Sequence, residues 1–291
     1  PEPAPAGLVW FRIALSGLKG GHSGDDIDKG RGNSNKLLNR FLRYGTREFG
    51  LRLAQFDGGN LRNAIPREAF AIFGVSAGCV KPMLERFETY KAEITAEFQM
   101  TESSLEVTLA EEPAPAQVVD EVTQRRLVNA VCGVPNGVLA MSSAMPGLVE
   151  TSTNLASVKF PEPGRIVVTT SQRSSVGSAR DEAAASVRAV FDLAGARVIH
   201  SDGYPGWNPN PGSRLLKVAE QTYERLFGHA PKVRAIHAGL ECGLFLEKYP
   251  HLEMVSFGPT LRGVHSPDER LEIPTVDKFW KLLVGVVDAL R

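Results

Sequence analysis

The chain has few cysteines, no excess of either charge and no long run of apolar residues. Its three cysteines lie far apart, which argues against a disulfide framework and favours the reducing cytoplasm. Lysine plus arginine and aspartate plus glutamate both total 33, so the basic excess expected for nucleic-acid binding is missing. No stretch is apolar over membrane-spanning length, and no signal peptide is visible. We therefore expect a cytoplasmic protein with no nucleic-acid or membrane partner.

The length of 291 residues and the 43% hydrophobic content are enough for about two domains. A segment rich in glycine, proline and asparagine, residues 202–212, interrupts the periodic patterns. We place the domain boundary there, with residues 1–203 in the first domain and residues 204–291 in the second.

The first domain shows two successive sets of strand and helix patterns. In the first set, strands are predicted at residues 7–15, 51–56, 67–75 and 104–109, and helices at residues 33–48 and 82–98. This β-α-β-β-α-β order is typical of a ferredoxin-like sandwich. In the second set, helices are predicted at residues 117–132 and 181–194, and strands at residues 138–141, 154–160, 165–172 and 197–200. We interpret this domain as an α/β unit of two ferredoxin-like halves that share element order but no sequence repeat.

The second domain is small for an independent α/β layer. Its predicted helices begin after Ser213, a good capping residue, and at residue 274, and its predicted strands are residues 233–236 and 254–257. We expect this part to complete a sheet whose other strands lie elsewhere, and to leave apolar strand surface uncovered by itself.

A glycine-rich loop at residues 17–24 carries a single histidine, His22, directly after a predicted strand. Glycine allows positive φ and close backbone approach, so His22 is held by the backbone and can donate a hydrogen bond to a ligand oxygen. A tight turn with an exposed histidine is the alternative, and the loop alone does not decide between them.

A second histidine, His265, lies far along the chain between a glycine and a proline. A neutral imidazole in such a loop is a good ligand for a divalent metal ion. A catalytic zinc site needs about three protein ligands, however, so His265 alone does not define one.

Four separated motifs stand at residues 17–24, at residues 60–66 (Asn-Leu-Arg-Asn-Ala-Ile-Pro), at residues 237–243 (His-Ala-Gly-Leu-Glu-Cys-Gly) and at residues 256–270. Together, and in this order, they resemble the aminoacyl-histidine dipeptidases. These are cytosolic Xaa-His (carnosine-type) dipeptidases of the two-zinc aminoacylase and carboxypeptidase superfamily. The resemblance implies that the chain holds the family's lid domain and the C-terminal part of its α/β catalytic domain.

The family's opening catalytic segment, which carries most of the metal ligands and the glutamate base, has no counterpart in these 291 residues. Two look-alikes, His200-Ser201-Asp202 and Glu111-Glu112, stand in the wrong order and are interpreted as solvated polar positions. Pro1 is no natural initiator, so we expect a processed or cut start. We also expect these residues alone to fold at least through the lid but not to hydrolyse dipeptides.

The resemblance implies roles for five residues. His22 would bind the scissile carbonyl and steady the oxyanion, and Asn63 and Arg173 would hold the substrate's end groups. His265 would be a metal ligand, and Glu241, in a site-facing motif, is placed with the substrate-binding residues without a defined role. Arg173 also fits on its own chemistry, because its planar fork matches a carboxylate, with a surface arginine at a strand end as the alternative.

The implied chemistry is metal-assisted hydrolysis of small peptides. Two zinc ions, with manganese or cobalt as alternatives, would lower the pKa of a bridging water, and a glutamate would take its proton. The lid would close over the substrate and serve as the surface of a homodimer. Two alternatives stay open: a non-catalytic binding or dimerisation module, and a two-zinc peptidase acting on tripeptides or acylated amino acids.

Overall fold

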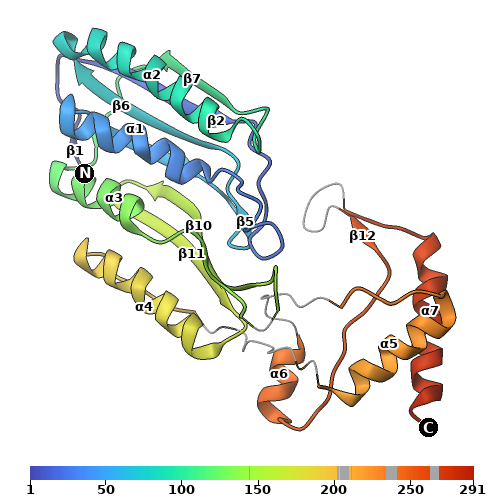
Figure 1. Ribbon diagram of the computed structural model, residues 1–291. Helices are drawn as coiled ribbons and strands as arrows, with labels where there is room; N and C mark the ends of the chain where they lie inside the picture. The colour runs from blue at the N-terminus through green and yellow to red at the C-terminus, as the bar shows by residue number, and fades with distance from the viewer. Residues whose placement is uncertain (144, 202, 204–209, 211, 234–240, 263–268) are drawn as a thin grey trace.

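The computed structural model describes residues 1–143, 145–201, 203, 210, 212–233, 241–262 and 269–291. Most strands belong to a seven-stranded antiparallel sheet in the N-terminal part of the chain. Figure 1 shows helices α2, α1, α3 and α4 side by side along this sheet, with helices α5 to α7 in a separate C-terminal part. Among the described residues, no helix is long and apolar enough to cross a membrane.

The elements have the following bounds. The strands are β1 (Glu2–Pro3), β2 (Leu8–Ser16), β3 (Gly21–His22), β4 (Arg52–Gly58), β5 (Ala64–Ile65), β6 (Ala69–Ser76), β7 (Glu106–Glu111), β8 (Gln117–Val118), β9 (Gly137–Met141), β10 (Val149–Glu162), β11 (Arg165–Ser174), β12 (Leu261–Arg262) and β13 (Arg270–Leu271). The helices are α1 (Ser34–Glu48), α2 (Val80–Phe98), α3 (Glu121–Gly133), α4 (Gly177–Leu193), α5 (Arg214–Phe227), α6 (Glu241–Lys248) and α7 (Pro274–Ala289).

The first half of the sheet has the predicted ferredoxin-like topology. Its strands lie in the order β4-β6-β2-β7, each antiparallel to its neighbours, with α1 between β2 and β4 and α2 between β6 and β7. Helix α1 begins at residue 34 because the side chain of Asn33 accepts hydrogen bonds from the next backbone N–H groups, Asn35 and Lys36. The mixed α/β class is confirmed.

The second half departs from the predicted repeat. Strands β9, β10 and β11 lie between α3 and α4, but residues 197–200 form no strand. Val198 instead packs its side chain against the hydrophobic core without pairing its backbone. Strand β10 joins β4 through one residue pair, Val158 with Gly58, so the two halves form one continuous sheet.

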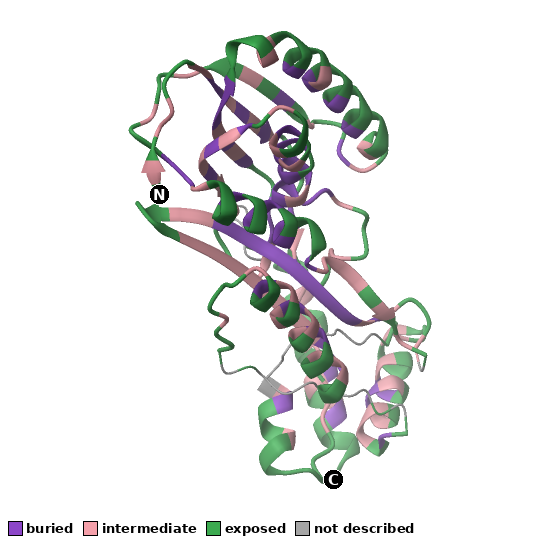
Figure 2. Cartoon of the chain, turned by 90° about the vertical axis from the view of Figure 1, so that its left-hand side faces the viewer, coloured by how far each residue is buried: buried purple, intermediate pink, exposed green. Residues whose placement is uncertain are grey.

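One hydrophobic cluster connects this sheet with helices α1 to α4. Strand β10 is buried over residues 151–158, which Figure 2 shows as a purple run. Several of these buried residues are polar and have hydrogen-bond partners. Thr151 Oγ1 lies 2.9 Å from Ser174 Oγ, Thr153 Oγ1 accepts from Gln172 Nε2 at 3.1 Å, and Asn154 Nδ2 donates to the carbonyl oxygen of Ala64 at 2.8 Å. The sheet edge formed by β10 and β11 is therefore fixed in place where the strand ends approach the His22 loop.

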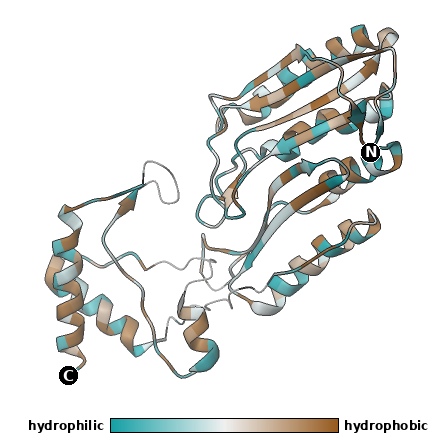
Figure 3. Ribbon diagram, turned by 180° about the vertical axis from the view of Figure 1, so that it is seen from behind, coloured by the Kyte–Doolittle hydropathy of each residue, from teal (hydrophilic) through white to brown (hydrophobic). Residues whose placement is uncertain are grey.

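The C-terminal part has a much smaller core, built where α5 packs on α7 around Ala219, Leu282 and Val286. Ser213 caps α5 as predicted, and its Oγ accepts from the N–H of Leu216 at 3.3 Å. Along the other side of α7, Ile273, Val276, Trp280 and Val284 are exposed, and Figure 3 shows this helix brown along much of its length. Apolar surface is thus uncovered, as expected, but on a helix.

The strand predicted at residues 254–257 is absent from this described segment, because Val255 and Phe257 pack onto the α5–α7 core without a strand partner. The strand predicted at residues 233–236 lies mostly outside the described residues. Helix α6 was not predicted, and the domain boundary at residue 203 stays a prediction.

Candidate functional site

The His22 loop lies directly beside Asn63. His22 in β3 pairs with Ala64 in β5, and the N–H of Ser23 donates to the carbonyl oxygen of Asn63 at 2.8 Å. Glycine makes this loop feasible: Gly17 has φ +75°, and a Cβ there would lie 1.8 Å from the carbonyl oxygen of Ser104. Two of the predicted site residues are therefore neighbours although they lie 41 positions apart.

Arg173 reaches the same loop from the end of β11. Its Nε donates to Ser23 Oγ at 3.3 Å, and Ser23 is almost fully buried. Burial is the main cause lowering the pKa of the Arg173 guanidinium; the charge of Asp25 acts in the opposite direction and that of Arg62 lowers it further. Arginine keeps its proton even when it is partly buried, because its ordinary pKa is so high. A partly desolvated cation therefore lies next to the His22 loop.

The side chains of His22 and Arg173 converge at Gly24. A Cβ on Gly24 would lie 3.0 Å from His22 Cε1 and 3.8 Å from Arg173 Nη1. His22 Nδ1 accepts from the backbone N–H groups of Gly24 and Asp25, each at 3.3 Å. With Nδ1 acting as an acceptor, the proton of the neutral imidazole sits on Nε2, which is the tautomer that can donate to a ligand oxygen.

Replacing Gly24 by alanine tests this convergence. The added Cβ meets an imidazole that two backbone hydrogen bonds hold in place, so we expect the ring to shift and turnover in the active enzyme to fall about 10- to 100-fold. Gly24 does not have a left-handed φ, so the folded state should keep its stability. Gly78→Ala, where a Cβ meets nothing within 4 Å, is the matched control, and equal turnover in the two variants would contradict the placement.

Glu102 supports the loop and has no signal in the sequence pattern. Its buried carboxylate accepts from the N–H of Lys19 at 2.8 Å and from the N–H of Gly32 at 2.9 Å, so it joins the two ends of the segment around His22. Within that segment, Asp26 accepts from the N–H of His22 at 3.0 Å and pairs with Arg31 at 2.8 Å. Only the folded chain brings these groups together.

Glu102→Ala should therefore destabilise the protein. Two backbone donors lose a charged acceptor, one of them buried, and we expect the free energy of unfolding to fall by about 2 kcal/mol. Glu102→Gln keeps one acceptor oxygen and should lose less. Urea unfolding of these variants, with the exposed Glu106→Ala as control, measures the difference; an unchanged midpoint for Glu102→Ala would contradict the role.

The other two predicted site residues cannot be added to this geometry. His265 lies outside the described residues, and Glu241 begins α6 with a side chain that the structure does not describe. Within the described residues, no group of three or more histidine, cysteine, aspartate or glutamate side chains could hold a metal ion.

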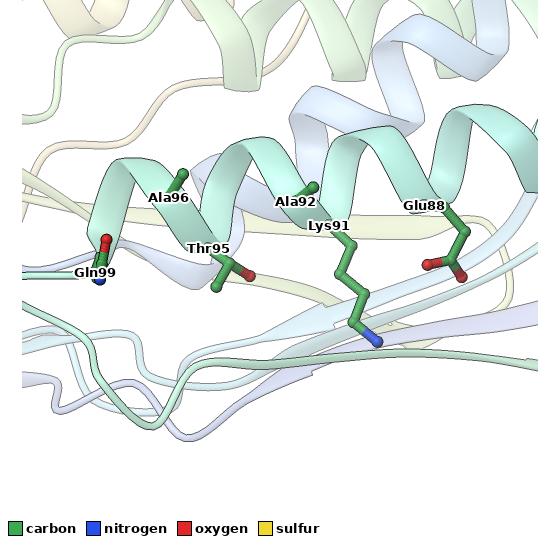
Figure 4. Close-up of a pocket in the computed structure, with 6 residues that line it drawn as sticks. All are labelled: Glu88, Lys91, Ala92, Thr95, Ala96 and Gln99. Carbon is green, nitrogen blue, oxygen red and sulfur yellow. The ribbon is translucent and has the colours of Figure 1, made fainter.

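A shallow hollow on the outer side of α2 is a poor candidate for a site. Figure 4 shows its lining, which comes from one helix alone and includes Glu88, Lys91 and Thr95. No side chains from different elements converge on it, and it has none of the polar contacts found around His22.

Two family models match the chain. The model described as "Peptidase dimerisation domain" matches residues 7–103, and the model described as "Peptidase family M20/M25/M40" matches residues 74–289. The chain belongs to peptidase family M20/M25/M40, which confirms the predicted family.

Two relatives resemble the chain over nearly its whole length. It is 42% identical to a cytosol non-specific dipeptidase of Escherichia coli (strain K12) over 289 residues, which is 98% of this chain and 59% of the relative. It also matches a crystal structure of aminoacylhistidine dipeptidase from Vibrio alginolyticus with a TM-score of 0.89 and 42% identity, covering 99% of this chain and 59% of that chain. The chain thus spans about three-fifths of the length of both relatives. The expectation that it has no activity by itself is not confirmed by these matches.

Proposed function

We propose that this chain forms the substrate-binding part of a metal-dependent dipeptidase that hydrolyses dipeptides of the Xaa-His type. The observation that supports this most is the convergence of His22 and Arg173 at Gly24. A hydrogen-bond donor and a fixed cation side by side match two oxygen-bearing groups of a dipeptide, the scissile carbonyl of its N-terminal residue and the carboxylate of its C-terminal residue.

In this proposal His22 Nε2 donates to the carbonyl oxygen and stabilises the negative charge that develops there. Arg173 binds the C-terminal carboxylate with its guanidinium fork, and Ser23 holds that guanidinium at Nε, leaving the Nη groups for the ligand. The side-chain amide of Asn63 binds an end group of the substrate. In a dipeptide the scissile carbonyl and the C-terminal carboxylate belong to consecutive residues, whose Cα atoms are about 3.8 Å apart. The donors that bind these two groups must therefore be neighbours.

The metal belongs to a part of the site that the described residues do not form. Two zinc ions, or manganese or cobalt, would supply a water with lowered pKa in such an enzyme. His265 would be one ligand, and Glu241 would act near the substrate. The described residues contribute substrate binding and orientation.

The cellular setting follows from the relatives. One of them is named a cytosol dipeptidase, and we place this protein in the cytoplasm as well. The matched dimerisation model supports a homodimer formed through the lid, with a small peptide as the other partner.

A substrate panel tests the proposal. The dipeptidase of which this chain is proposed to form the substrate-binding part, with added Zn²⁺ or Mn²⁺, should hydrolyse Xaa-His dipeptides and lose this activity with a chelator. Tripeptides and N-acylated amino acids should be turned over much more slowly. Hydrolysis of either of these classes in place of dipeptides would favour the related-peptidase alternative, and no turnover of any substrate would favour a non-catalytic module.

A further inference from the structure

A second hollow lies on the helical side of the lid and begins at Arg31, at the end of the segment around His22. It has a volume of about 640 Å³ and runs along the outer face of α1, between α2 and the C-terminal end of α3. Unlike the hollow in Figure 4, it is lined from several elements. We call it the α1 groove.

Cations dominate the lining of the α1 groove. Helix α1 contributes four of them at successive turns of one face, and the neighbouring segments contribute two more; they are Lys36, Arg40, Arg43 and Arg47, with Arg31 and Arg86. Glu48 is the carboxylate in the lining. The whole chain has a formal net charge of zero, so this local excess is not a reflection of its composition.

Half of these cations are already neutralised by neighbours. Arg31 pairs with Asp26 at 2.8 Å and Arg86 with Glu93 at 2.8 Å. Arg40 pairs with Glu97 through both terminal nitrogens. These pairs are part of the walls and leave the other three cations to be explained.

The remaining cations keep donors that face no carboxylate partner among the described residues. Lys36 Nζ donates to the carbonyl oxygens of Cys132, at 3.0 Å, and Val134, which leaves the third of its three protons. Arg43 uses Nε on Asn129 Oδ1 at 3.2 Å and keeps both terminal nitrogens. For Arg47, no hydrogen bond or ion pair occurs within the described part of the chain. Burial lowers the pKa of Lys36 to about 8, as expected for an ammonium without a counter-ion.

We propose that the α1 groove binds a linear chain of linked phosphate groups, as in inorganic polyphosphate or the triphosphate of a nucleotide. Lys36 and Arg47 lie 11 residues apart on one helix, about 16 Å at 1.5 Å per residue. Donors without a carboxylate partner stand along that length at Lys36, Arg43 and Arg47. Guanidinium forks and an ammonium are the groups that bind phosphate oxygens in proteins.

An acidic peptide fits the groove less well. One common way to hold an extended peptide is through its main chain at an open sheet edge. The floor and walls here are the helices α1, α2 and α3, whose backbone groups are bonded within each helix. A peptide would be held by its side-chain carboxylates alone, whereas a phosphate chain carries its charges on the backbone itself.

Calorimetric titration of the purified chain tests this proposal. The probes are tripolyphosphate, ATP, adenosine, inorganic phosphate and a hexaglutamate peptide, at low and high salt. We expect tripolyphosphate and ATP to bind, more weakly at high salt, with adenosine giving no heat. Equal affinities for tripolyphosphate and ATP would show that the site binds the phosphate chain itself. Tighter binding of ATP would show that it binds a nucleotide.

The variant Arg43→Gln/Arg47→Gln should weaken tripolyphosphate binding by about tenfold for each lost contact. Neither side chain is buried, so the fold should be retained. Lys81→Gln/Lys91→Gln, which removes two exposed cations from α2 outside the groove, is the matched control. No binding of tripolyphosphate, equal losses in both double variants, or equally tight binding of hexaglutamate would each overturn the proposal.

Discussion

Replacing His22 by alanine is expected to lower kcat of the active enzyme about 10²- to 10³-fold, which is the usual cost of losing one donor to an oxyanion. The Michaelis constant should change little, because the carbonyl oxygen gains its charge only in the transition state. The His22 ring accepts from two backbone N–H groups in a partly exposed loop, so urea unfolding should show a small loss of stability.

Two further variants separate this role from a general disturbance of the site. His22→Gln retains an N–H donor and should recover part of the lost turnover. His200→Ala removes an exposed histidine whose Nε2 accepts from Arg188 Nε at 3.2 Å. Its kcat should equal that of the wild type. Near-normal kcat for His22→Ala would exclude the oxyanion role.

Arg173→Ala is expected to raise the Michaelis constant about 10- to 100-fold, because a charge-assisted hydrogen bond to the substrate carboxylate is lost from a partly desolvated site. Since the carboxylate does not react, kcat should fall much less. Arg173→Lys keeps the charge but not the planar guanidinium fork. Its Michaelis constant should lie between those of the wild type and Arg173→Ala.

The control for Arg173 lies on the same strand. Arg165→Ala, at the opposite end of β11, removes an exposed arginine that pairs with Glu162 at 3.1 Å. Its kinetics should be unchanged. Similar Michaelis constants for both alanine variants would rule out the carboxylate contact.

The first half of the seven-stranded sheet could be predicted because its elements are long and its patterns are regular. Phe11, Ile13 and Leu15 alternate with more exposed residues along β2 and are all buried. The same logic failed at Val198, Val255 and Phe257. Alternation indicates which side chains are buried, but a strand also needs a neighbouring strand to pair with. These three residues pack onto hydrophobic cores without such a neighbour.

The geometry of the site lay beyond sequence patterns for a different reason. Strands β3 and β5 have two residues each, too few to show any period, yet their pairing puts His22 beside Asn63. Arg173 meets Ser23 across 150 positions of sequence. Glycine, histidine and arginine residues could be singled out by their chemistry. That His22 and Arg173 meet at Gly24 depends on how β11 and the β3–β5 pair are placed in the folded chain.

Arg173 and the His22 loop are proposed to bind two groups of one dipeptide, Arg173 its C-terminal carboxylate and His22 its scissile carbonyl. The most direct measurement is kcat/KM of wild type and Arg173→Ala with a Xaa-His dipeptide and with its C-terminal amide. We predict that amidation strongly lowers kcat/KM for the wild type and makes little further difference to Arg173→Ala, because the two changes remove the same contact. Equal losses on amidation in both proteins would contradict the claim.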